Sequence, residues 1–121
     1  MLIITVLGVP NSSSTASLQQ VKVELKDAVA GITELNLSTD QIMVFFVESI
    51  STRYPESGIA VFIDGLSDEP DRTNDVRARL AKLVGKTILL SFPQRRLSEC
   101  LIRPFQPELG FWSSADESSG E

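Results

Sequence analysis

The first third of the chain carries two spacings of apolar residues, one typical of a strand and one typical of a helix. Residues 2–7 form an unbroken, largely β-branched run, after which Gly8, Pro10 and several serines interrupt the pattern. Between about residues 16 and 32 the apolar positions recur at steps of three and four, with charged residues between them; they are Leu18, Val21, Leu25, Val29 and Ile32. The pattern predicts a strand followed by an amphipathic helix whose apolar stripe covers a sheet.

The middle of the chain predicts two further strands. Gln41–Glu48 contains six consecutive apolar residues, several of them β-branched or aromatic, and we expect this strand to be buried on both faces. The polar segment 49–57 is expected to be a connection. Gly58–Ile63 is expected to be a third strand, which closes at a turn formed by Asp64 and Gly65.

The same order of elements then begins again. Residues 67–71 place acidic side chains at a helix start, and the apolar stripe that follows predicts a second helix; its members are Val76, Leu80, Leu83, Val84 and Ile88. Pro93 stops that helix, and Glu99–Phe105 is expected to be the fourth strand. Residues 113–121 contain no apolar residue beyond Ala115, so this tail is expected to be disordered.

These elements predict one α/β (α+β) domain over residues 1–112, made of two β-α-β halves that span about residues 2–48 and 59–106. Right-handed crossovers would put both helices on one face of a four-stranded sheet. The opposite face keeps part of the apolar surface and needs a partner. We therefore expect the chain to associate with copies of itself.

The charge and hydrophobicity of the chain exclude two classes of partner. The net charge is −5 and the eleven Lys and Arg residues are scattered, whereas nucleic-acid binding needs a clustered basic face. The longest apolar runs, such as Ile42–Val47, are far shorter than the roughly 20 residues that a membrane span requires. Residues 1–7 lack the positive start of a signal peptide. We expect no nucleic-acid partner, no membrane contact and a cytoplasmic location.

Few residue types in the sequence are suited to catalysis. There is no histidine, which excludes a Cys-His nucleophile pair and a His-based metal site, and the one cysteine, Cys100, lies in an apolar stretch typical of a core. Asp64 and Gly65 most simply form a turn, although four acidic residues near the second helix start cluster enough to suggest weak cation binding; they are Asp64, Asp68, Glu69 and Asp71. We still expect no metal and no cofactor.

Four short segments carry a resemblance to a known family. They are LIITV at residues 2–6, DQIMV at 40–44, DRTND at 71–75 and PELGFW at 107–112. In order, they are similar to the first strand, the second strand, the Gly-Arg-Thr-type opening of a helix and the segment after the last strand of the tautomerase superfamily. That superfamily includes 4-oxalocrotonate tautomerase, macrophage migration inhibitory factor and an uncharacterised bacterial branch. The likeness covers about residues 2–113, and it implies a tautomerase-like fold that assembles as a homotrimer.

Catalysis in that family depends on an N-terminal proline, which is exposed by removal of the initiator methionine and acts as a general base. This sequence has Leu2 in its place, and because leucine is too bulky for the usual removal of methionine, we expect Met1 to be retained. The family's strand-two arginine, which binds a substrate carboxylate in some members, falls on Met43, and its helix-start arginine falls within Pro10–Ser14. The resemblance therefore implies the scaffold without proline-based catalysis.

The resemblance also places a candidate ligand site around the start of the first strand. Its members in this sequence are Leu2, Glu48, Arg103, Phe111 and Trp112. An arginine beside an aromatic wall can hold a small carboxylate by paired hydrogen bonds. Each residue has an ordinary alternative: an ion pair for Arg103, packing or subunit contact for the two aromatic residues, and solvation for Glu48.

Two functions remain open. One is a protein that binds a small carboxylate-containing ligand, or only assembles, on a tautomerase-like scaffold; the other is a divergent isomerase or tautomerase of a small keto or enol acid. A more distant alternative is a ferredoxin-like regulatory domain, which has the same count of strands and helices and is expected to be a dimer rather than a trimer.

Overall fold

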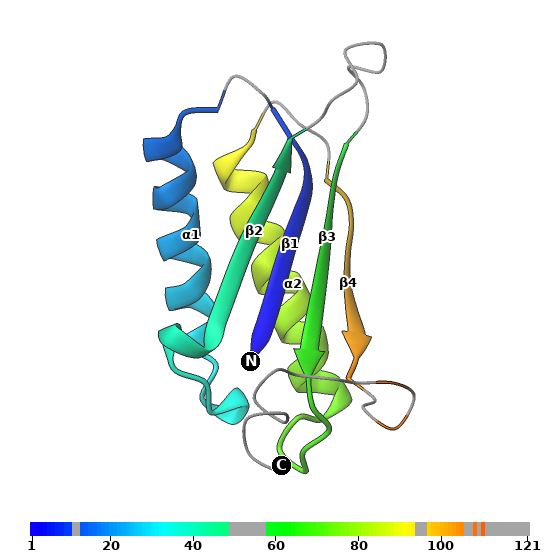
Figure 1. Ribbon diagram of the computed structural model, residues 1–121. Helices are drawn as coiled ribbons and strands as arrows, with labels where there is room; N and C mark the ends of the chain where they lie inside the picture. The colour runs from blue at the N-terminus through cyan, green and yellow to red at the C-terminus, as the bar shows by residue number, and fades with distance from the viewer. Residues whose placement is uncertain (11–12, 49–57, 94–96, 106–107, 109, 111–121) are drawn as a thin grey trace, which may run out of the picture.

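The computed structural model describes residues 1–10, 13–48, 58–93, 97–105, 108 and 110. These residues form a sheet and two long helices; Figure 1 shows one helix behind the strands and the other beside them at the left, and both contribute side chains to the same core on one face of the sheet. The strands are β1 (Leu2–Val9), β2 (Ile42–Glu48), β3 (Ile59–Leu66) and β4 (Leu97–Pro104). The helices are α1 (Thr15–Ala30) and α2 (Asn74–Ser91), and two short 3-10 helices, η1 (Thr33–Leu35) and η2 (Thr39–Gln41), connect α1 to β2.

The strand order is β2-β1-β3-β4, so each long helix connects two adjacent parallel strands. An antiparallel pair, β1 with β3, joins the two halves at the centre of the sheet. This order excludes the ferredoxin-like alternative, because there another strand separates the two strands of each β-α-β unit. The prediction of two β-α-β halves with both helices on one face is confirmed.

The two halves begin with closely similar strands. β1 and β3 have the same length and the same alternation of buried and half-buried residues, and each has a glycine in its seventh position. Gly8 and Gly65 both have a positive φ and lie where the strand pairing shifts register. The expected turn at Asp64 and Gly65 is therefore wrong: β3 continues to Leu66, and the glycine accommodates a bulge inside the strand.

The two long helices also begin and pack alike. The Ser14 side chain accepts a hydrogen bond from the backbone N–H of Ser17 at the start of α1, and Thr73 accepts one from Val76 at the start of α2. Both helices bury residues at steps of four, which are Val21, Leu25 and Val29 on α1 and Leu80, Val84 and Ile88 on α2. Each such side chain stabilises the core by about 1.5–3 kcal/mol. Neither helix in the described part of the chain has the length and hydrophobicity needed to cross a membrane.

No helix or strand in the described part of the chain covers the face of the sheet opposite the helices. Strand register and one ion pair place twelve residues there in three rows across β2, β1, β3 and β4: Met43-Ile3-Asp64-Arg103, Phe45-Thr5-Phe62-Leu101 and Val47-Leu7-Ala60-Glu99. We call these twelve residues the open face. Met43, Phe45 and Val47 are 38%, 47% and 45% exposed, so the expectation that β2 is buried on both faces is wrong for the single chain. The helices cover only one face.

Candidate functional site

The end of the sheet at which β1 begins is also the end at which β3 and β4 finish (Figure 1). Arg103 and Leu2, two of the residues that the sequence singles out, both lie at this end. The Leu2 side chain is 1% exposed and belongs to the core, so it cannot contact a ligand on the open face. Arg103 points to the other side of the sheet, where it is exposed.

Of the three further candidates, the structure describes only Glu48, which lies away from Arg103. Glu48 is exposed and pairs with Val9 at the last step of the β1–β2 register. Because β1 and β2 are parallel, Glu48 lies at the opposite end of the sheet from Arg103, so the two residues do not flank one site within a single chain. Phe111 and Trp112 lie outside the described residues.

Arg103 forms a two-point ion pair with Asp64 on the neighbouring strand. Arg103 Nε donates a hydrogen bond to Asp64 Oδ1 at 2.6 Å, and Nη2 donates one to Oδ2 at 2.7 Å. The guanidinium also covers the Phe62 ring, with Cζ 4.6 Å from the ring centroid. The hydrogen bonds and the charge of Asp64 raise the pKa of Arg103, so this group keeps its positive charge. We call Ile3, Phe62, Asp64 and Arg103 the Arg103 corner.

The ion pair leaves one edge of the guanidinium available. Nε and Nη2 face Asp64, whereas Nη1 donates no hydrogen bond to any described residue. The side chain of Arg103 is 54% exposed and that of Asp64 is 30% exposed. Arg103 is the single cation among the twelve residues of the open face. The position on β2 at which the resemblance places a second arginine is occupied by Met43. A second carboxylate can therefore approach Arg103 from the Nη1 side.

Arg103 is the one residue of this corner that the sequence predicts as part of a ligand site; Ile3, Phe62 and the role of Asp64 were missed. The Asp-Gly dipeptide is common in turns, and that local signal led to the expectation of a turn. A different signal was present, because Asp64 continues the alternation of Ala60 and Phe62 along one side of a strand. The ordinary alternative for Arg103, an ion-paired strand residue, is what the structure shows.

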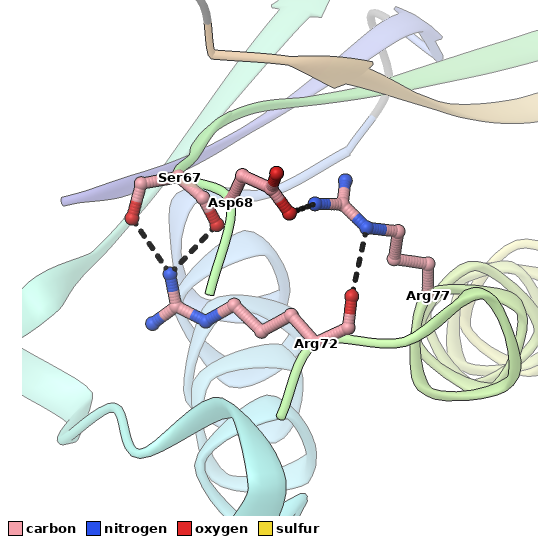
Figure 2. A network of polar contacts seen from close by, with 4 residues as sticks. All are labelled: Ser67, Asp68, Arg72 and Arg77. Carbon is pink, nitrogen blue, oxygen red and sulfur yellow. Dashed lines mark hydrogen bonds and ion pairs between the residues drawn. The ribbon is translucent and has the colours of Figure 1, made fainter. Parts of the chain in front are cut away.

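A second polar network lies in the connection between β3 and α2 (Figure 2). Arg72 Nη1 donates to the carbonyl oxygen of Ser67 at 3.0 Å and to its hydroxyl at 2.9 Å, and Nη2 donates to the carbonyl oxygen of Leu35 at 2.8 Å. Arg77 Nε donates to the carbonyl oxygen of Arg72 at 3.1 Å, and its Nη2 lies 3.6 Å from Asp68 Oδ1. Arg72 thus ties the start of α2 to η1 and has a structural role.

Two open hollows of about 480 and 530 Å³ adjoin this network and share Glu69 and Arg72 in their walls. The four acids considered for weak cation binding do not gather at these hollows, because Asp64 lines neither hollow and is held by Arg103 on the open face, while Asp68 pairs with Arg77. Within the ranges that the structure describes, no three potential metal ligands come together. The weak cation site considered for these acids is therefore not assembled.

Cys100 packs against the core from the helix-facing side of β4, as the sequence predicts. Burial raises the pKa of its thiol to about 11. The thiol therefore stays protonated at neutral pH, and a protonated thiol is a poor nucleophile. Nothing in this geometry gives Cys100 a catalytic role.

The fold matches several solved structures at low sequence identity. A domain of unknown function from Sebaldella termitidis has a TM-score of 0.64 and 13% identity, over 93% of this chain and 95% of that chain. Macrophage migration inhibitory factor from Toxoplasma gondii has a TM-score of 0.62 and 15% identity, over 92% of this chain and 94% of that one. The Q0 fused 4-OT wild-type symmetric trimer has a TM-score of 0.61 and 15% identity, over 86% and 84% of the two chains.

No protein-family model and no curated protein matches the sequence. The fold implied by the resemblance is confirmed by the structural matches. At these identities the likeness establishes the fold and leaves the activity open.

Proposed function

Starting from this tautomerase-type fold, we propose that the chain forms a homotrimer and binds a small carboxylate-containing ligand at the Arg103 corner, without proline-based catalysis. The observation that carries the proposal is the pairing of Arg103 with Asp64 over the Phe62 ring. This guanidinium already holds one carboxylate by two hydrogen bonds, and its Nη1 donates to no residue that the structure describes. Charge-assisted hydrogen bonds of this kind are among the stronger ones in proteins.

Proline-based catalysis has no counterpart in β1. The strand contains no proline, and the one nearest to it in sequence, Pro10, follows the opposite end of β1 from Arg103. With Met1 retained, as we expect, the backbone nitrogen of Leu2 belongs to a peptide bond and is not basic, so it would not act as the general base that the family's proline provides. This supports ligand binding rather than the family's proton transfer.

Self-association is supported by the composition of the open face. Eight of its twelve residues are apolar, and they form a continuous surface around Phe45 and Phe62. Continuous exposed apolar surfaces are typical of protein–protein interfaces. The fused 4-OT structure with this fold is a symmetric trimer. In such an assembly a neighbouring subunit would cover the open face and place the Arg103 corner at a subunit boundary.

The binding proposal is tested by calorimetric titration of pyruvate, a small 2-oxo acid, into the full chain. Arg103→Ala is expected to weaken pyruvate binding at least about tenfold, because it removes the charged donor. Asp64→Asn is expected to strengthen binding severalfold, because the neutral amide no longer competes for the guanidinium.

Lys22→Ala is the control. Lys22 also carries a positive charge, but it lies on α1, away from the open face. Its replacement is expected to leave pyruvate affinity unchanged. Equal pyruvate affinity in the wild type and Arg103→Ala, or no binding by the wild type, would overturn the proposal.

The second candidate, a divergent isomerase of a small keto or enol acid, is favoured by the structural likeness to 4-OT and macrophage migration inhibitory factor. An enol of an arylpyruvate absorbs in the ultraviolet, so its conversion to the keto form can be followed directly. The binding proposal expects the chain to leave this rate at the buffer value. An acceleration that Arg103→Ala abolishes would establish the isomerase instead.

A further inference from the structure

A groove on the helix layer combines apolar and cationic residues. It encloses about 290 Å³ and is lined by Ile32, Arg79, Lys82, Leu83 and Lys86. Ile32 follows the end of α1, and the other four residues belong to α2. Ile32 and Leu83 are half-buried, so they keep apolar surface in contact with water, whereas the three cationic side chains are exposed.

The cationic residues lie on one side of α2 and are incompletely neutralised. Arg79, Lys82 and Lys86 follow at steps of three and four, which places them on one helix face. Arg79 Nη2 is bound by Glu34 Oε2 at 2.6 Å. Lys82 and Lys86 form no ion pair with any residue that the structure describes. Like charges four residues apart repel one another, and an anion between them would relieve that repulsion.

From this combination we infer that the groove binds a small anionic amphiphile, a medium-chain carboxylate. The carboxylate lies between Lys82 and Lys86, and the hydrocarbon chain covers Leu83 and Ile32. The volume lies just below the roughly 300–1,000 Å³ of ordinary ligand pockets, which favours a small molecule over a peptide or protein segment. The positive charge is local, because the whole chain carries a net charge of −5.

The groove and the open face lie on opposite sides of the sheet. The helices cover the face that carries the core, and the groove is formed by residues on the helix layer. Self-association through the open face would therefore leave the groove accessible. The inference does not depend on the homotrimer or on ligand binding at the Arg103 corner.

The experiment is a calorimetric titration of the full chain with octanoate, acetate and 1-octanol at low ionic strength. Octanoate is expected to bind at least about fivefold more tightly than either of the others, because acetate lacks the apolar chain and octanol lacks the charge. The variant Lys82→Ala/Lys86→Ala is expected to weaken octanoate binding about tenfold. Both replacements are at exposed positions, and circular dichroism verifies that the helices are retained.

Lys22→Ala/Lys26→Ala is the charge-matched control, since it removes two lysines of α1 that do not line the groove. It is expected to bind octanoate as the wild type does. Equal weakening by both double variants, or equal affinity for octanoate and octanol, would overturn the inference. Binding to phosphatidylglycerol vesicles without binding of free octanoate would also overturn it and would assign the groove to a membrane surface.

Discussion

Gly65 occupies a position that no L-residue can take without strain. Its φ is 86°, and a Cβ at this position would collide with the carbonyl oxygen of Met1. Because the obstacle is backbone and not a flexible side chain, β1 would have to move. We expect Gly65→Ala to lower the free energy of unfolding by about 3 kcal/mol, measured by urea denaturation.

Gly31→Ala is the control for this substitution. Gly31 has a φ of −71°, and an added Cβ would meet the carbonyl oxygens of Ala28 and Asp27 at 3.3 and 3.4 Å. The change in stability is expected to stay within about 1 kcal/mol. An equal loss in both alanine variants would contradict the account of Gly65.

Burial of the Cys100 thiol is expected to make the folded protein less stable at alkaline pH. Its pKa is raised from 9.0 to about 11 by burial, so the native thiol keeps a proton that the unfolded chain releases. The contribution of the protonated thiol to the free energy of unfolding is fully present below pH 9.0 and is lost as the pH rises toward 11. Urea denaturation at several alkaline pH values is expected to show this decline in the wild type.

Cys100→Ala should lack that part of the decline, whatever its stability at neutral pH. The comparison therefore uses the slope of unfolding free energy against pH and not its absolute value. Identical slopes for the two proteins would show that the thiol does not titrate as described.

Among the elements, the helices were the most predictable from the sequence. The stripe from Leu18 to Ile32 has a single period, and α1 follows it closely as Thr15–Ala30. The run Ile42–Val47 predicted a strand correctly but misled about its burial. An apolar residue on a strand face has the same sequence signal whether a helix of the same chain or another surface covers it.

The position of Glu48 could not be predicted for a different reason. Its place at the end of a strand follows from the local pattern, but its neighbours depend on which strands pair and in which direction. The Asp64–Arg103 pair likewise depends on the parallel pairing of β3 with β4, between residues 39 apart in sequence. Local periodicity carries no information about such pairings.

Arg72 connects two elements that are distant in sequence. Its guanidinium donates to Ser67 and to the carbonyl oxygen of Leu35, so it bridges the β3–α2 connection and η1. Lysine cannot reproduce this planar arrangement of donors. We expect Arg72→Lys to lower the free energy of unfolding by about 1–3 kcal/mol, measured by urea denaturation.

Arg79→Ala serves as the comparison for Arg72→Lys. The Arg79–Glu34 pair is exposed on both sides, and solvent screens such surface pairs so that they contribute little to stability. A loss in Arg72→Lys no larger than that in Arg79→Ala would contradict the bridging role of Arg72.

On the scale of the whole molecule, the two faces of the sheet differ in what covers them. The helix-facing side is closed by the core, and the helix layer beyond it carries the cationic groove. The other side exposes the open face, where Phe45 and Leu101 are 47% and 46% exposed. Self-association through this face would remove apolar surface from water and would complete the surroundings of the Arg103 corner.

Light scattering of the full chain over a series of concentrations tests the central claim, self-association through the open face, most directly. The wild type is expected to have a mass near three times the 13.3 kDa of one chain. Phe45→Asp places a charge in the open face and should reduce the mass to that of a monomer. Val23→Asp, at a similarly exposed position on α1, should leave the trimer intact. A wild type that stays monomeric at every concentration, or a Phe45→Asp variant that remains trimeric, would contradict the account.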